Sequence, residues 1–217
     1  MRNVILTILM TAALLALSAA PLLSQEQDRN ASLDRKVRAF LDARSGNWRD
    51  LNVPASDGKL LHDIILRNNY RQALEIGTST GHSAIWIAWA LSRTGGKLIT
   101  VEIDEARHKQ ALANFREAGL SEYIDARLGD AHELVPKLPG PFDFVFSDAD
   151  KDWYRNYFDA VAPKLKVGGA YVSHNVSDRG WNPFGLGKYV DYIKGRKDFE
   201  TTFDDNGAGV SVSYKKR

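Results

Sequence analysis

The chain has 217 residues, of which 44% are hydrophobic, and its 29 basic and 27 acidic side chains leave a net charge of +2. This length is enough for one globular domain with a core of its own. The near balance of charge argues against a dedicated nucleic-acid-binding protein, which would carry a basic stripe. The chain has no cysteine, which excludes disulfide bonds, thiolate metal sites and a cysteine nucleophile.

The N-terminal stretch is typical of a secretory signal peptide, because Arg2 precedes a long apolar run that ends in small residues. Cleavage after Ser18, Ala20 or Ser24 fits this pattern, and the run is also long enough to remain as an uncleaved membrane anchor. Residues 1–25 are therefore assigned to a signal peptide or membrane anchor, and residues 26–217 to a single domain. We expect an exported (periplasmic or secreted) or membrane-anchored protein, or a cytoplasmic one if translation starts near Asp28.

Helices and strands alternate along most of the chain. A first helix is expected from Ser32, a favoured capping residue, to Gly46, and a second over residues 56–66. Strands are then predicted at 72–77, 97–104, 124–130, 142–149 and 168–176, with helices between them at 83–93, 105–119, 132–138 and 153–165. This order requires crossover connections and therefore predicts an α/β fold with a parallel sheet.

The C-terminal tail differs from the rest. Residues 199–205 and 206–216 are two further strands, joined by a tight turn that contains Asn206 and Gly207. They predict an antiparallel hairpin at the end of an otherwise parallel sheet.

Polar residues and glycines follow each predicted parallel strand, and in open α/β sheets ligands bind at the carboxyl ends of the strands. We therefore expect one site that gathers Glu75, Gly77, Thr78, Ser79, Thr80, Gly81, Glu102, Asp104, Asp130, Ala131, His132, Asp148, Asp150, Lys151, His174 and Asn175.

The turn after the first parallel strand favours a particular ligand. Gly77 and Gly81 let a ligand approach the backbone, but the middle glycine of the dinucleotide fingerprint is absent, which disfavours a nicotinamide dehydrogenase. Glu75 would repel a phosphate and suits a cationic ligand, whereas Glu102 is placed to bind ribose hydroxyls. A ribose, a positive group and no phosphate together fit S-adenosylmethionine.

From about Leu51 onwards the sequence resembles the cation-dependent O-methyltransferases that act on small molecules, which include the caffeoyl-coenzyme A and catechol O-methyltransferases. The stretches that carry the resemblance are NVPASDGKLLHDII, ALEIGTSTGHSA, VEIDEARHKQALANFREAGL, FDFVFSDADKDWYRNYF, LKVGGAYVSHNV and NGAGVSVSYKK. The resemblance implies a Rossmann-like class I methyltransferase fold, with a seven-stranded, mostly parallel sheet, a C-terminal antiparallel hairpin and helices on both faces.

The resemblance also implies roles for individual residues. Lys151 matches the general base of the catechol branch, and Asp148 and Asn175 match ligands of a divalent cation such as magnesium, manganese or zinc. The residues expected at or beside S-adenosylmethionine are Glu75, Gly77, Thr78, Gly81, Ser83, Glu102, Asp130, Ala131, His132 and Asp148.

One position departs from the family pattern, because His174 stands where the family has a second metal-binding aspartate. Three interpretations remain open. Asp148, His174 and Asn175 bind a softer metal, since imidazole suits manganese or zinc better than magnesium; the same residues bind magnesium weakly through water; or the site is metal-free and His174 is the general base.

The predicted activity is methyl transfer to a small hydroxyl acceptor, with a vicinal dihydroxy aromatic as the expected type. The alternative is a non-catalytic protein that binds an adenosyl ligand on the same fold. Trp181 and Phe184 lie in a loop expected to close over the acceptor, and the segment from Asp57 to Leu61 is expected near both ligands. Relatives are often homodimers, although the sequence itself does not indicate an oligomeric state.

Overall fold

The computed structural model describes residues 24–48, 50–180 and 184–217, so all but the last two residues of the expected signal peptide, and Trp181, lie outside the described residues. The chain divides into two units, Met1–Ala43 and Arg44–Arg217. In the first unit, residues 24–43 form a helix, so the expectation that Ser32 caps a helix was wrong: it lies within one. In the part of the chain that the structure describes, no helix is long and apolar enough to cross a membrane.

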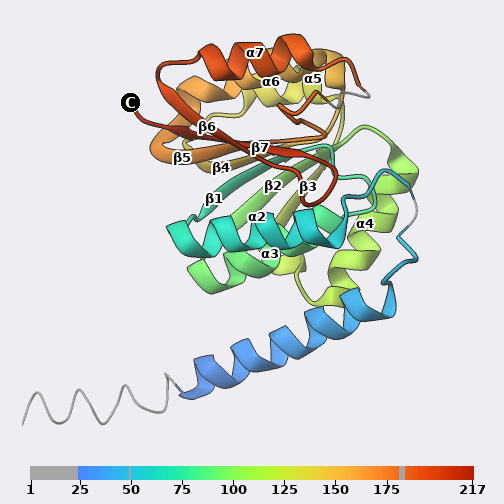
Figure 1. Cartoon of the computed structure of the whole chain (residues 1–217). Coiled ribbons are helices and arrows are strands. Elements are labelled where there is room, and N and C mark those ends of the chain that lie inside the picture. Colours follow the sequence, from blue (N-terminus) through green and yellow to red (C-terminus); the bar gives the residue numbers. More distant parts are fainter. Residues whose placement is uncertain (1–23, 49, 181–183) are drawn as a thin grey trace, which may run out of the picture. The chain divides into compact units, whose positions relative to one another are not determined.

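The second unit is built on a seven-stranded sheet with helices on both faces (Figure 1). The strand order is β3-β2-β1-β4-β5-β7-β6, in which the five strands on one side are parallel and β7 runs antiparallel to both of its neighbours. The predicted fold class is confirmed. The strands are β1 (Gln72–Ile76), β2 (Lys97–Glu102), β3 (Ile124–Leu128), β4 (Phe142–Ser147), β5 (Leu165–His174), β6 (Phe199–Asp204) and β7 (Val210–Lys215).

Three helices cover each face of the sheet. On one face lie α2 (Ala55–Asn68), α3 (His82–Thr94) and α4 (Glu105–Ala118), and on the other α5 (Ala131–Lys137), α6 (Tyr154–Val161) and α7 (Gly187–Gly195) (Figure 1). The sequence prediction missed α7, although its buried residues Tyr189, Val190 and Ile193 have helical spacing.

Burial on all sides explains why α3 is apolar nearly all round, while β4, although equally buried, also carries Asp143 and Ser147. All six residues of β4 are buried at the centre of the sheet, and ten of the thirteen residues of α3 are buried against α2 and the sheet. Elements that are covered all round have no solvent face, so their sequences show continuous apolar runs rather than alternation.

The ends of β1 and β4 approach each other closely, and this approach positions the site. Gly77 has φ +97°, and a Cβ atom added there would lie 3.0 Å from the backbone of Asp148 and Ala149. Position 77 therefore requires glycine, because glycine tolerates the positive φ and has no Cβ atom that would clash with the neighbouring backbone. It lets the turn after β1 lie directly against the turn after β4.

The hairpin connection is longer than the tight turn that the sequence predicts. Residues 205–209 separate β6 from β7, and the Ala208 amide donates to Asp57 Oδ2 in α2 at 3.0 Å. The connection thus reaches from the end of the sheet to a helix on one of its faces.

Candidate active site

A cavity of about 410 Å³ opens at the carboxyl ends of the parallel strands. Six of the residues predicted to lie at or beside the cofactor line it: Gly77, Glu102, Asp130, Ala131, His132 and Asp148. The remaining four, Glu75, Thr78, Gly81 and Ser83, are not among its lining residues. The sequence analysis did not select the lining residues Leu51, Val101, Ile103, Arg107, Ala149 and Tyr157 as cofactor contacts.

The Glu102 carboxylate is held rigidly at the cavity wall. Its Oε2 accepts from the Ser79 amide at 2.7 Å, its Oε1 accepts from the Asp104 amide at 3.0 Å, and Arg107 lies 3.9 Å from Oε1. A carboxylate fixed by backbone amides at the end of β2 is suited to accept hydrogen bonds from ribose hydroxyls.

Glu75 is fully buried behind this wall, with one oxygen engaged and one without a partner. Oε2 accepts from Thr100 Oγ1 at 2.5 Å, while Oε1 has no hydrogen-bond partner among the described residues, although the Ser83 hydroxyl lies nearby. Burial, reinforced by the negative charges of Asp148 and Glu102, raises the pKa of Glu75 to about 8. A buried acceptor without a donor suits a ligand that brings a cationic N–H group.

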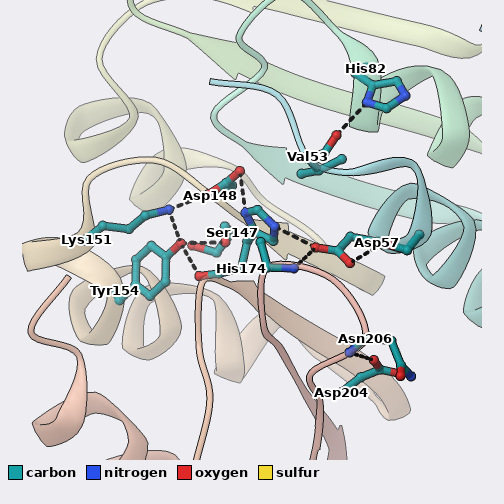
Figure 2. Close-up of polar contacts among 12 residues, drawn as sticks. Val53, Asp57, His82, Ser147, Asp148, Lys151, Tyr154, His174, Asp204 and Asn206 are labelled. Carbon is teal, nitrogen blue, oxygen red and sulfur yellow. Dashed lines mark hydrogen bonds and ion pairs between the residues drawn. The ribbon is translucent and has the colours of Figure 1, made fainter. Parts of the chain in front are cut away.

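Lys151 lies at the end of β4 between a carboxylate and a phenol (Figure 2). Its ammonium pairs with Asp148 Oδ1 and donates to Tyr154 Oη at 2.7 Å. Tyr154 Oη lies 3.1 Å from the carbonyl oxygen of Ser147 and 3.0 Å from that of His174, so it joins the ends of β4 and β5. Tyr154 is buried, as expected for a core residue, and its hydroxyl fixes the lysine side chain.

His174 lies between two carboxylates (Figure 2). Its Nε2 is 2.9 Å from Asp57 Oδ2, and its Nδ1 is 3.1 Å from Asp148 Oδ2 but out of line for a good hydrogen bond. Burial by itself lowers the pKa of His174, but the two carboxylates outweigh it and raise the pKa to about 9. With a carboxylate oxygen beside each ring nitrogen, the surroundings favour the protonated form of the imidazole.

The expected metal ligands do not fit a divalent cation in this arrangement. The Asp148 oxygens face Lys151 and His174, and both ring nitrogens of His174 face carboxylate oxygens, so none of these atoms is open to a metal. Within residues 24–48, 50–180 and 184–217, no group of three or more His, Asp or Glu side chains is arranged to hold a metal ion. Asn175 follows β5 in a left-handed conformation, with φ +59°, and is half-buried.

Asp57 was not among the residues expected to act in the site; it contacts His174, and it lies in the segment Asp57–Leu61 that is expected near both ligands. Asp57 stands in the first turn of α2, where an acidic residue ordinarily needs no explanation beyond the helix dipole. No local pattern connects it with a histidine 117 residues later.

Two aromatic residues complete the surroundings. Phe184 is half exposed, and its ring centre lies 5.6 Å from the Lys151 ammonium. His132 stacks on Trp153 with ring centres 3.8 Å apart, and its Nε2 is 3.2 Å from Asp150 Oδ2. His132 thus lines the cavity, and Trp153 packs against it from outside the lining.

Comparison with known proteins identifies the family. Residues 25–183 match the O-methyltransferase family profile, so the chain belongs to the O-methyltransferase family. It is 36% identical over 130 residues to a catechol O-methyltransferase of Niastella koreensis, with 58% of each chain covered. It is 34% identical over 159 residues to caffeoyl-CoA O-methyltransferase 1 of Eucalyptus globulus, with 68% of this chain covered. The matches span 58% and 63% of these two relatives' own lengths.

Solved structures agree in fold. The O-methyltransferase TomG from Streptomyces achromogenes, solved in complex with S-adenosylmethionine, is 29% identical to this chain. The TM-score is 0.70, and the match covers 83% of this chain and 88% of that chain.

Proposed function

We propose that this protein transfers the methyl group of S-adenosylmethionine to a hydroxyl group of a small aromatic acceptor of the catechol type. The observation that carries the proposal is the position of Lys151, which is ion-paired with Asp148 at the wall of the cavity. The catechol type follows from relatives named catechol and caffeoyl-CoA O-methyltransferases. Export or membrane anchoring through residues 1–25 is also a proposal, supported by the sequence pattern alone.

The cofactor would be held by two carboxylates with different tasks. Glu102, fixed by two backbone amides, accepts from the ribose, and the unpartnered Oε1 of Glu75 accepts from the ammonium group of the methionine part. S-adenosylmethionine supplies a methyl group on a positively charged sulfur, which an oxygen nucleophile attacks in line. The chain's part is to hold that oxygen in position and to remove its proton.

Lys151 is the residue proposed to remove the proton. In the resting site Lys151 is an ammonium paired with Asp148, so it must first release a proton to solvent; the neutral amine then takes the proton from the acceptor hydroxyl at Nζ, and Asp148 Oδ1 stabilises the ammonium that results. The alternative base, His174, fits this task poorly, because both of its ring nitrogens face carboxylates.

The test is the substitution Lys151→Met, which removes the amine and keeps much of the side-chain volume. We expect turnover with labelled S-adenosylmethionine and a catechol panel to fall by roughly 10²–10⁴-fold, the range for loss of a general base. Calorimetric affinity for the cofactor should change little.

Lys137→Met is the matched control, because Lys137 lies on exposed α5 and pairs only loosely with Glu133 at 3.8 Å. Unchanged turnover in Lys151→Met would refute the role of Lys151. Tight cofactor binding by the wild type without methyl transfer to any acceptor would favour the non-catalytic binding protein.

A further inference from the structure

We infer that His174, seated between Asp57 and Asp148, is the built-in cation of this site in place of a divalent metal, and that Asp57 is a positioning residue for methyl transfer. The inference rests on the proposed function above, and it concerns how the same site works.

The charges of the cluster balance without a metal. We use "cluster" for Asp57, Asp148, Lys151 and His174; its two carboxylates face the Lys151 ammonium and an imidazole whose two ring nitrogens both meet carboxylate oxygens, the arrangement in which an imidazole carries a positive charge. Asp148 uses one oxygen for each cation. A divalent metal would need the oxygen that His174 faces and would add two positive charges beside Lys151 and His174, in a place where water cannot screen them.

The fold closes the cluster from three separate segments. Asp57 comes from α2, His174 from the end of β5, and the Ala208 amide from the β6–β7 connection donates to the same Asp57 oxygen that faces His174. Asp57 and His174 are 3% and 4% exposed. A Cβ atom at Gly207 would lie only 1.5 Å from Asp57 Oδ1, so the connection packs tightly over the carboxylate.

Burying these charged groups costs desolvation free energy, and a purely structural role does not explain why the fold accepts that cost. A buried ion pair often contributes little net stability compared with an apolar pair of the same volume. Here the ion pair stands at the end of β5, beside β4, and Lys151 lies in the turn that follows β4. Asp148 contacts both His174 and Lys151 and so connects them directly. His174 therefore fixes the carboxylate that orients Lys151, which is the positioning task.

A site without a metal also changes how many hydroxyl groups the acceptor needs. A metal in the site would favour acceptors with vicinal hydroxyls, since two neighbouring oxygens are better ligands than one. The cluster instead presents the Lys151 ammonium, with the half-exposed Phe184 ring beside it. We therefore expect one phenolic hydroxyl to suffice, so that a monohydroxy phenol is methylated within about tenfold of the rate for its catechol counterpart.

The first experiment uses the wild-type chain without variants. After treatment with a chelator, methyl transfer should stay within about twofold of the untreated rate, and Mn²⁺ should give no bound signal in electron paramagnetic resonance. Loss of transfer that Mn²⁺, Zn²⁺ or Mg²⁺ restores would overturn the inference and leave the proposed function intact. If no acceptor is methylated, the proposed function fails, and Mn²⁺ binding still decides whether the site holds a metal.

The second experiment tests whether His174 prevents the site from binding a metal. His174→Asp restores the carboxylate of the family pattern beside Asp57 and Asp148, and this group of like charges needs a cation. We expect the variant to bind Mn²⁺ by the same resonance measurement, whether or not it is active. A variant that folds, as judged by cofactor binding, but binds no Mn²⁺ would contradict this explanation.

The third experiment tests Asp57 as a positioning residue, using Asp57→Asn with Asp63→Asn as the matched control. Both are on α2, but Asp63 is partly exposed and pairs with Lys59 at the surface. Asp57→Asn should lower kcat by about tenfold or more with little change in KM for the cofactor, and it should remove the low-field proton signal of the His174 ring N–H. Loss of stability with kcat and the signal unchanged would show a structural role only.

Discussion

At the scale of single residues, Glu75 and His174 show how burial acts differently on two charged groups of one site. Both side chains are almost completely removed from water. His174 has carboxylates on two sides, so its charged form is favoured despite burial. For Glu75, burial and the nearby negative charges of Asp148 and Glu102 outweigh the hydrogen bonds from neighbouring hydroxyls, so its pKa is raised and its neutral form is favoured. The ligand, and not the protein, must supply the counter-charge that Glu75 lacks.

This difference predicts that cofactor binding depends on pH through Glu75. Because the pKa of Glu75 is raised to about 8, the carboxyl is mostly protonated below that pH, and binding a cationic ligand must expel the proton. Affinity for S-adenosylmethionine should rise about tenfold between pH 6 and pH 7 and level off above pH 8. Calorimetry in two buffers of different ionisation enthalpy would detect the released proton.

The control is Glu75→Gln, whose affinity should be lower and much flatter with pH. The variant also tests the effect on folding, because a carboxyl with a raised pKa in the folded state loses its stabilising contribution as pH rises from about 4.5 to about 8. At pH 9 the unliganded variant should therefore melt higher than the wild type. Equal pH dependence of affinity in both proteins would refute the assignment.

At the scale of elements, the β6–β7 connection does more than join two strands. It supplies the Ala208 amide to Asp57 and packs Gly207 over the same carboxylate. The C-terminal hairpin, which is antiparallel to the rest of the sheet, therefore takes part in the site formed by α2 and β5.

At this scale we predict that the substitution Gly207→Ala lowers turnover strongly but lowers the free energy of unfolding only moderately. The added methyl group would collide with Asp57 Oδ1, and the carboxylate can move only by leaving His174 and the Ala208 amide. We expect turnover to fall at least tenfold, with a loss of roughly 1–3 kcal/mol in the free energy of unfolding. Enzyme assays and urea denaturation would measure the two effects.

Gly195→Ala is the matched control, since a Cβ atom at Gly195 meets nothing within 4 Å. It should leave both quantities unchanged. If Gly207→Ala is as active as Gly195→Ala, the connection does not hold Asp57 in place.

At the scale of the whole domain, the cavity is formed by turns that follow four different strands, β1 to β4. A ligand that contacts all four turns binds the folded state and not the unfolded chain, so it raises the apparent stability.

Saturation with S-adenosylmethionine at about 100 times its Kd should add roughly 2.7 kcal/mol. For a domain of this size, that corresponds to a rise in Tm of about 5–10 °C. NAD at the same concentration should give no shift, because the turn after β1 lacks the middle glycine of the dinucleotide fingerprint. Equal shifts with both ligands in differential scanning fluorimetry would count against the cofactor assignment.

The order of the elements was predictable because it depends on local patterns. Strands and helices that alternate in apolar periodicity give the parallel sheet, and the residues that follow each strand give its carboxyl edge. The contact between Asp57 and His174 was not predictable in the same way, because it depends on how α2 packs beside β5. For the same reason the sequence offered His174 as a metal ligand or a base, and only the fold shows that each of its ring nitrogens faces a carboxylate.

The identity of residue 174 has a genetic consequence. Histidine and aspartate codons differ by one base, so a single nucleotide change would exchange the imidazole for the carboxylate of the family pattern. The other members of the site, Asp57, Asp148, Lys151 and Asn175, need not change with it. If the inference above holds, a metal-free and a metal-dependent methyltransferase are separated by one mutational step, and lineages of this family can have crossed it repeatedly without passing through a disassembled site.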